Sequence, residues 1–207
     1  MTSLPALVVL TDRRQARAGL VPTVAAAVEG GARAVVLREK DLPRPARWEL
    51  GRALRAVLDP HGAMLLVAGP DVELAEELGA GGVHLAAGDA WPSGWRPPLV
   101  GRSCHDAVEL QRAAEEAADY ATLSPVFASA SKPGYGPALT EAGLAELAAA
   151  TELAVFALGG VTAESAGPCL GAGAAGVAVM GAVMGADDPA GAAAALVASM
   201  ARELHRS

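Results

Sequence analysis

The sequence predicts an α/β fold, a single-domain (β/α)8 TIM barrel over residues 1–207. Short apolar runs alternate with Ala-rich amphipathic stretches from end to end, and the runs are nearly continuous, as in parallel strands that helices cover on both faces. Eight such units in 207 residues leave about 26 residues per unit, which suits a compact barrel. A doubly wound open sheet would alternate in the same way, but no Gly-x-Gly-x-x-Gly pattern follows the first run.

Each predicted strand is a short apolar run bounded by polar or glycine-rich turns. In chain order, the strands are expected at Leu7–Thr11, Ala34–Arg38, Met64–Val67, Gly82–Leu85, Leu99–Ser103, Tyr120–Leu123, Ala154–Leu158 and Gly176–Met180. Helices are expected at Val24–Glu29, Arg44–Leu58, Val72–Leu78, Asp106–Ala118, Thr140–Ala150, Ala163–Leu170 and Pro189–His205. The last helix has the clearest start, because Asp188 and Pro189 are residue types that favour the N-cap and the first helical position.

The composition excludes several classes of protein. With 52% hydrophobic and 19% charged residues the chain is compact rather than disordered, and a net charge of -7 argues against a general nucleic-acid binder. Two cysteines do not make a disulfide framework. Because neither a secretory signal nor a membrane-spanning apolar run is found, the sequence predicts a cytoplasmic protein with no membrane partner. Whether the chain forms a homo-oligomer stays open.

The second strand ends in a cationic cluster. Residues 36–40 read Val-Leu-Arg-Glu-Lys, and alternation places Arg38 and Lys40 on one side and Glu39 on the other. In a parallel barrel the carboxyl ends of the strands form the active face, so two cations there suit a diphosphate. The alternative is a solvated loop with a Glu-Lys surface pair. Asp12, after the first strand, is either a ligand contact or a turn-former.

The fourth and fifth strands carry polar residues at the same end. His84, inside an apolar strand, is predicted to be a satisfied core histidine more often than a catalyst. Asp89 in the next loop could ligate Mg²⁺. Ser103 could donate its hydroxyl to a phosphate, with His105 close to it, whereas Cys104 is expected to be inert packing.

Three later loops favour anion binding. Ser129, Ser131 and Lys132 follow the sixth strand and combine hydroxyls with a cation, although an ordinary mobile loop would look similar. The loops after strands seven and eight contain Gly159-Gly160 and the segment that begins at Gly181. That pair of loops is the usual phosphate cradle of barrels, so the partners expected are small phosphorylated substrates.

These residues resemble the thiamine phosphate synthase/TenI superfamily, over essentially the whole chain. Residues 11–12 match the Thr-Asp that ends the family's first strand, and residues 36–40 match its Gln-x-Arg-x-Lys pattern. Its Gly-Val-His-Leu and Gly-x-Ser-x-His patterns appear at residues 82–85 and 101–105. The Ala-Asp-Tyr segment, the hydroxyl-x-hydroxyl-Lys loop, the Gly-Gly pair and the Gly-Val-Ala-Val strand appear at 118–120, 129–132, 159–160 and 176–179.

The resemblance implies a transferase of thiamine biosynthesis, which joins hydroxymethylpyrimidine diphosphate to thiazole phosphate and releases pyrophosphate. It implies a dissociative reaction, in which diphosphate leaves, a pyrimidine cation forms and the thiazole nitrogen attacks. The implied catalytic residues, on the pyrimidine diphosphate, are Arg38, Lys40, Ser103 and Lys132. The implied substrate-binding residues are Ser129, Ser131, Gly159, Gly160, Gly181 and His105. Of these, Ser129, Ser131, Gly160 and the loop at Gly181 would hold the thiazole phosphate. Mg²⁺ held by Asp89 is the implied cofactor.

The chain departs from the family pattern around the metal and the pyrimidine. The family's Gln is Val36 here, and its Asn-Asp after the third strand is Gly69-Pro70. One expected Mg²⁺ carboxylate is therefore replaced by Pro70, with Asp71 adjacent to it. The Gln of the family's Gly-Gln-x-Asp loop is Ala87.

Three functions stay open at this point. Thiamine phosphate synthesis is supported by the cations, Ser103 and Asp89. A TenI-like thiazole tautomerase is favoured by the lost metal ligand but opposed by Pro125, which stands where TenI proteins carry histidine; His105 or His84 would have to be its acid/base. A non-catalytic paralogue that binds thiazole phosphate would keep the phosphate cradle alone.

Overall fold

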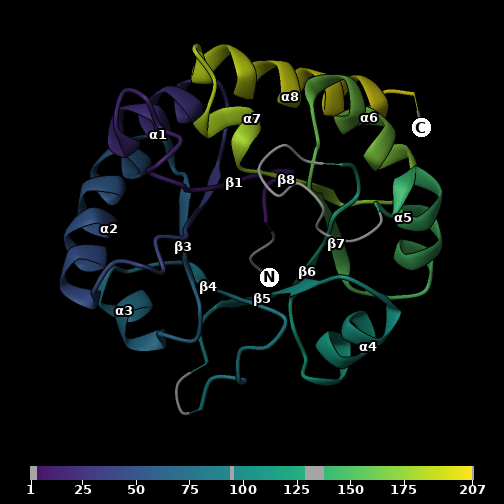
Figure 1. Cartoon of the computed structure of the whole chain (residues 1–207), viewed down its shortest axis with the longest axis horizontal. Helices are drawn as coiled ribbons and strands as arrows, with labels where there is room; N and C mark the ends of the chain where they lie inside the picture. Colours follow the sequence, from purple (N-terminus) through teal and green to yellow (C-terminus); the bar gives the residue numbers. More distant parts are fainter. Residues whose placement is uncertain (1–3, 94–95, 129–137, 207) are drawn as a thin grey trace.

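The computed structural model describes residues 4–93, 96–128 and 138–206, and its strands close into one parallel barrel ringed by helices (Figure 1). The strands pair in chain order, and β8 returns to β1 with Leu7 opposite Val177. They are β1 Leu7–Leu10, β2 Ala34–Leu37, β3 Met64–Ala68, β4 Gly82–Leu85, β5 Leu99–Cys104, β6 Tyr120–Leu123, β7 Ala154–Leu158 and β8 Gly176–Val179. The predicted (β/α)8 barrel is confirmed.

The helices alternate with the strands as the sequence predicts, with local differences. They are α1 Leu20–Glu29, α2 Arg44–Leu58 with the 3₁₀ turn η1 Asp59–His61, α3 Val72–Glu77, α4 Ala107–Glu115, α5 Thr140–Ala149, α6 Ala163–Gly171, α7 Gly181–Met184 and α8 Pro189–Leu204. Helix α1 begins one turn earlier than predicted, because Pro22 is tolerated in a first turn that has no intrahelical use for its N–H. Helix α7 replaces a predicted loop. None of the helices in the described ranges is long and apolar enough to cross a membrane.

Side-chain caps start several helices where the sequence places a carboxylate. The Asp188 carboxylate accepts the Gly191 N–H at 3.0 Å, so the predicted start of α8 is confirmed. Asp106 does the same for α4 by accepting the Glu109 N–H at 2.8 Å. Each cap satisfies a backbone donor that has no partner inside its helix.

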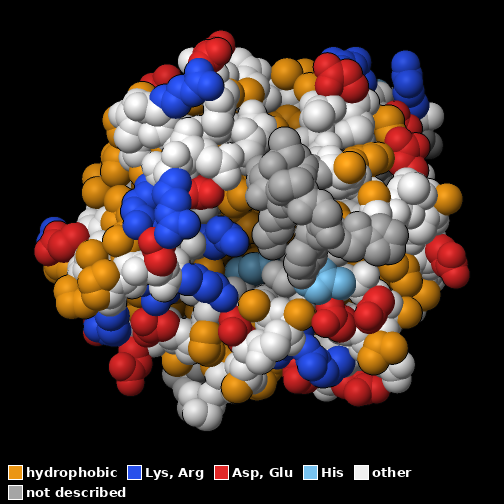
Figure 2. All heavy atoms as spheres, in the orientation of Figure 1, with side chains coloured by type: hydrophobic (Ala, Val, Ile, Leu, Met, Phe, Trp, Pro, Cys, Tyr) orange, Lys and Arg blue, Asp and Glu red, His pale blue; other side chains and the backbone are white. Residues whose placement is uncertain are grey.

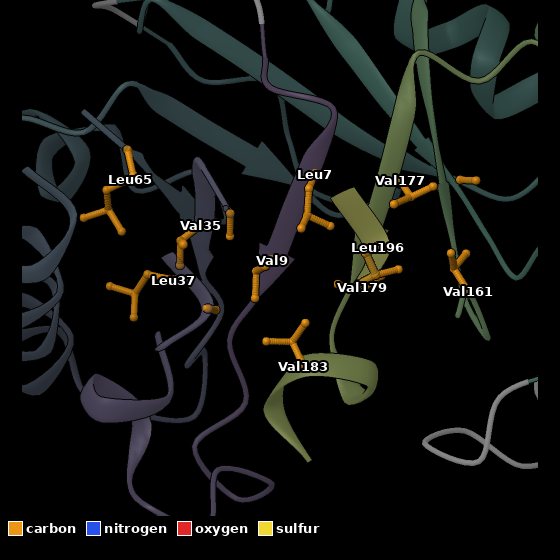
Figure 3. Close-up of a cluster of buried hydrophobic side chains, with 14 of the residues drawn as sticks. Leu7, Val9, Val35, Leu37, Leu65, Val161, Val177, Val179, Val183 and Leu196 are labelled. Atoms are coloured by element: carbon orange, nitrogen blue, oxygen red, sulfur yellow. The ribbon is translucent and has the colours of Figure 1, made fainter. Parts of the chain in front are cut away.

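The larger part of the core lies between the outside of the barrel and the helices. Outward-facing strand residues such as Val9, Val35 and Val177 pack there against helix residues such as Val183 and Leu196 (Figure 3). This layer explains why the strands read as continuous apolar runs: their alternate residues are buried in the barrel interior instead.

The barrel interior is filled by a second, smaller cluster. Val8, Leu10, Val36, Leu66 and Phe156 are all buried in it. Leu4 packs against this cluster from the segment that precedes β1. The interior is therefore a packed core rather than a channel, as in other barrels of this size.

One interior layer is polar and lies across β4, β5 and β6. His84, Tyr120 and Thr122 are buried, at 5%, 2% and 1% exposure. Room for the Tyr120 ring comes from Gly101 on β5, because a Cβ at that position would collide with the ring and its hydroxyl. The glycine of the Gly-Arg-Ser sequence thus serves packing at this point.

We predict that Gly101→Ala destabilises the protein by about 1–3 kcal/mol, the usual cost of overpacking a filled core. The measurement is denaturant unfolding. Gly88→Ala is the matched control, because a Cβ there would meet nothing within 4 Å and its change in unfolding free energy should stay near zero. Equal stability of the two variants would contradict the packing role of Gly101.

Burial of His84 predicts a pH-dependent stability. Desolvation, followed by the charge of Lys40, lowers the pKa of His84 from 6.5 to about 4. Between pH 6.5 and about pH 4, this histidine is protonated in the unfolded chain but neutral in the folded protein. The free energy of unfolding is therefore highest above pH 6.5 and decreases on acidification, by up to about 3 kcal/mol from this group. His84→Gln should lack that part of the acid dependence in unfolding titrations. Identical pH slopes for both proteins would contradict the prediction.

Candidate active site at the carboxyl ends of the strands

The carboxyl ends of the strands meet at one rim, where the loops bring the predicted residues together. Figure 2 shows this face, with Lys and Arg side chains gathered on the side of α1 and α2 and histidine side chains near the middle. The predicted residues Ser129, Ser131 and Lys132 lie outside the described residues. The others are placed as follows.

The cationic cluster after β2 alternates as predicted. Arg38 is half-buried, and its Nη1 lies 3.8 Å from the sulfur of Met180, at the end of β8. Lys40 points to the other side of the mouth, with Nζ 3.3 Å from Asp89 Oδ2. The two cations therefore face the mouth from β2, toward β8 and toward the β4 loop.

Glu39 faces the opposite way and is only 2% exposed. Its carboxylate accepts the backbone N–H of Arg13 at 3.0 Å and the Arg13 guanidinium at 2.8 Å. The solvated Glu-Lys pair is thus not what the structure shows. Glu39 ties the β1 loop to the β2 loop and leaves Lys40 directed at the mouth.

The β1 loop is organised by carboxylates. Asp12 accepts the Arg14 N–H at 3.1 Å and the Gln15 amide at 2.8 Å, so it acts as a turn-former. The Arg13 guanidinium beside Asp41 holds the pKa of that carboxyl below its usual range. Arg13 pairs with Glu39 and Asp41 at the rim, Arg14 pairs with Asp41, and Arg17 pairs with Asp187.

Asp89 is held by the loop that follows β4. Its Oδ2 accepts the Ala86 N–H at 2.8 Å, in addition to the contact with Lys40. Arg102, fully buried on β5, donates from Nη1 to the carbonyls of Ala86, Ala87 and Asp89 at 3.2, 3.1 and 3.0 Å. The buried Arg102 side chain therefore fixes the loop that carries Asp89.

Sequence reasoning missed Arg102. The same side chain forms an ion pair with Glu116 at 2.7 Å and lies 5.8 Å from the ring centroid of Trp91. The alternation of side chains along β5 could have indicated its position, because Arg102 points to the outside of the barrel when Ser103 points to the inside. A cation at a buried outward position must find several acceptors, and a loop of carbonyls supplies them.

Asp71 does not face the mouth as a free carboxylate. Its Oδ1 accepts the Leu74 N–H at 3.0 Å and caps α3. Its Oδ2 lies 3.6 Å from both Arg44 Nε and Arg47 Nη1. Within the residues that the structure describes, no group of three or more His, Cys, Asp or Glu side chains could hold a metal ion.

Ser103 and His105 leave β5 in different directions. Ser103 is half-buried and its Oγ lies 2.9 Å from His84 Nε2 in the polar layer. His105 turns toward the end of β6, with Nδ1 2.7 Å from the carbonyl oxygen of Ser124. Cys104 between them is buried, and desolvation raises the pKa of its thiol to about 12, which agrees with inert packing.

The glycines after β7 allow two loops to approach closely. Gly159 and Gly160 have φ values of 96° and 63°, which favour glycine. A Cβ on Gly159 would lie 2.9 Å from Pro125 Cα, and one on Gly160 would collide with the carbonyl of Ala128. Segment 126–127 is hydrogen-bonded to the end of β7, from the Val126 N–H to the Leu158 carbonyl at 2.9 Å.

Gly181 is the first residue of α7, directly after β8. In α7 the Val183 and Met184 N–H groups donate to the Met180 carbonyl at 3.1 and 2.8 Å. Among the described residues this leaves the Gly181 and Ala182 N–H groups, at the start of the helix, as the backbone donors available beside the Gly-Gly turn. The mouth thus has Lys40 and Ser103 on the side of β2, β4 and β5, and the start of α7 on the side of β8, with Arg38 reaching from β2 toward β8. Such a site can hold two anionic groups at once.

Known proteins match the chain over nearly all of its length. The family described as thiamine monophosphate synthase matches residues 7–183. A thiamine-phosphate synthase of Roseiflexus castenholzii is 39% identical, over 91% of this chain and 85% of its own. One of Chromobacterium violaceum is 41% identical, over 86% of this chain and 88% of its own.

A solved structure agrees with the sequence relatives. The thiamine phosphate pyrophosphorylase of Pyrococcus furiosus superposes with a TM-score of 0.83 and 30% identity, and 96% of each chain is covered. Sequence and structure comparisons thus point to one family. The chain belongs to the thiamine monophosphate synthase family.

Proposed function

We propose that the chain is a thiamine-phosphate synthase, which couples hydroxymethylpyrimidine diphosphate to thiazole phosphate and releases pyrophosphate. One observation carries the proposal: a chain of this family keeps Arg38 and Lys40 directed into the mouth, at the same rim as the Gly159-Gly160 turn and the start of α7. The two cations could stabilise the charge of a leaving diphosphate, and the glycine-rich backbone could bind a phosphate that does not react.

In the proposed reaction, the bond between the pyrimidine methylene carbon and the diphosphate oxygen breaks, and its electron pair leaves with the diphosphate. The thiazole nitrogen then donates its lone pair to that carbon. Arg38, Lys40 and Lys132 are proposed to stabilise the charge that gathers on the leaving group, and Ser103 to donate a hydrogen bond to it. The thiazole phosphate is proposed to bind at Ser129, Ser131, Gly159, Gly160, Gly181 and His105.

The tautomerase alternative would need His84 or His105 as its acid/base, and both histidines are engaged in hydrogen bonds within the protein. His84 is buried, and its two ring nitrogens lie 2.9 Å from Tyr120 Oη and from Ser103 Oγ. Its lowered pKa also keeps it from acting as an acid near neutral pH. His105 is directed at the Ser124 carbonyl. These contacts favour coupling over proton shuttling.

Mg²⁺ is the cofactor that the resemblance implies, and Asp89 is the carboxylate that would contact it. The described residues do not fit a resident ion with two carboxylates: Asp89 Oδ2 already meets Lys40 and the Ala86 N–H, and Asp71 caps α3 beside two arginines.

The direct test is formation of thiamine phosphate from the two substrates, followed by chromatography. We expect product from the wild-type protein, and a loss of about 10²-fold or more in kcat for Lys40→Ala, because one preorganised charge on a leaving group is worth that much. Arg206→Ala removes an exposed cation, 76% accessible, and should leave the rate unchanged. Thiazole phosphate binding without any product would instead indicate the non-catalytic paralogue.

We further predict that the protein alone binds Mn²⁺, a spectroscopic substitute for Mg²⁺, only weakly. The reason is that the ammonium of Lys40 already pairs with the Asp89 carboxylate. Electron paramagnetic resonance of free Mn²⁺ in a titration with protein measures this. Stoichiometric binding that disappears in Asp89→Asn would show a resident metal site and contradict the prediction.

A further inference from the structure

A chain of hydrogen bonds leads from the barrel interior to the mouth. Tyr120 Oη lies 2.9 Å from His84 Nδ1, and His84 Nε2 lies 2.9 Å from Ser103 Oγ. Thr122 Oγ1 is a weaker neighbour of the same nitrogen at 3.5 Å. Tyr120 and His84 are buried, whereas Ser103 is half-buried and sits at the upper end of β5. The chain therefore starts in the core and ends at the candidate active site.

The rings of this chain are fixed by packing. The Tyr120 and His84 rings are stacked, with centroids 5.5 Å apart and planes 25° apart. Phe156 packs edge-on against Tyr120 with centroids 5.7 Å apart. Gly101 leaves the space that the tyrosine ring occupies. Neither the Tyr120 ring nor the His84 ring can rotate without disturbing its neighbours. Which atom donates and which accepts in each hydrogen bond therefore depends only on which atoms carry the protons.

The protons can be assigned from burial. Desolvation raises the pKa of Tyr120 above its usual range, so the phenol keeps its proton. His84, with a pKa of about 4, is neutral near pH 7 and has one proton on two nitrogens. Among the contacts of the described residues, His84 Nδ1 is the acceptor that Tyr120 Oη reaches. A buried hydroxyl donates to the acceptor available to it, so Nδ1 accepts and the ring proton stands on Nε2.

The assignment determines what Ser103 does. With its proton on Nε2, His84 donates to Ser103 Oγ, and the serine proton is left to point away from the imidazole, toward the mouth. The charges of Lys40 and Arg38 lower the pKa of His84 while that of Asp89 raises it, so the imidazole lies within the field of the charged groups at the mouth. A Ser103 hydroxyl that donates its proton beside cationic side chains would bind an anionic oxygen of a ligand in preference to an amine.

We propose that Tyr120 and His84 are positioning residues that fix the tautomer of the imidazole and so turn Ser103 into a hydrogen-bond donor toward an anionic ligand group. That the anion is the leaving diphosphate rests on the proposed function. The tautomer and the direction of the bond do not, because they follow from the contacts in the core.

Nitrogen-15 NMR of histidine-labelled protein tests the tautomer without any activity. We expect His84 Nε2 to be pyrrole-like and Nδ1 pyridine-like, and Tyr120→Phe to lose this fixed pattern. Phe156→Leu is the matched control, because it changes the packing of the same layer but keeps the tyrosine hydroxyl; it should keep the wild-type pattern. A proton on Nδ1 in the wild-type protein would overturn the proposal.

A double-mutant cycle tests the consequence for catalysis. Tyr120→Phe should lower kcat/KM about three- to tenfold, the worth of one net hydrogen bond, and should have no further effect in a Ser103→Ala background. His84→Gln, which keeps an acceptor and a donor, should recover more of kcat than His84→Leu. Additive effects of Tyr120→Phe and Ser103→Ala would contradict the coupling. A wild-type protein without synthase activity would remove the proposed function, while the nitrogen signals would still decide the tautomer.

Discussion

The filling of the upper barrel interior is the constraint on which the site depends. The space between β4, β5 and β6 holds a tyrosine ring only because β5 has no side chain at Gly101, and the ring in turn places its hydroxyl against His84. A polar pair buried this deeply must satisfy its hydrogen bonds within the protein. Ser103 Oγ is the hydrogen-bond partner of His84 Nε2, so the packing of the core fixes the position of a hydroxyl group at the mouth.

Around that atom, buried charges arrange the loops. Glu39 and Arg102 both lie outside the barrel interior, are almost fully buried, and each ties backbone of a catalytic-face loop: Glu39 the β1 loop and Arg102 the β4 loop. Glu39 thereby joins the β1 loop to the β2 loop that carries Lys40, and Arg102 holds the β4 loop that carries Asp89; Lys40 Nζ and Asp89 Oδ2 lie 3.3 Å apart. Breaking either buried anchor would leave an uncompensated charge, so the loops have little freedom to drift.

Much of the fold could be predicted, because alternation and strand-to-strand spacing are local properties of the sequence. The strand order, the caps at Asp188 and the alternation of residues 38–40 follow from it and agree with the structure. The helix at Gly181–Met184 was not predicted, since four residues carry too little periodicity to separate a helical turn from a loop.

The candidate site was predictable in its residue types but not in its contacts. The sequence placed Asp71 beside the lost metal ligand, yet only the structure shows that it caps α3 and faces two arginines. His84 was expected to be a satisfied core histidine, and its partners confirm that; the identity of Tyr120 and Ser103 as those partners depends on register across three strands. Such pairings join residues far apart in the chain, and no local pattern specifies them.

We propose above all that the mouth is divided into a diphosphate side at β2–β5 and a phosphate side at β7–β8. A crystal structure of the protein with hydroxymethylpyrimidine diphosphate, without thiazole phosphate, tests this most directly. We expect the diphosphate to bind between Arg38, Lys40 and the Ser103 hydroxyl. A diphosphate bound instead at Gly160 and Gly181, with the cations still turned to Asp89 and Met180, would contradict it.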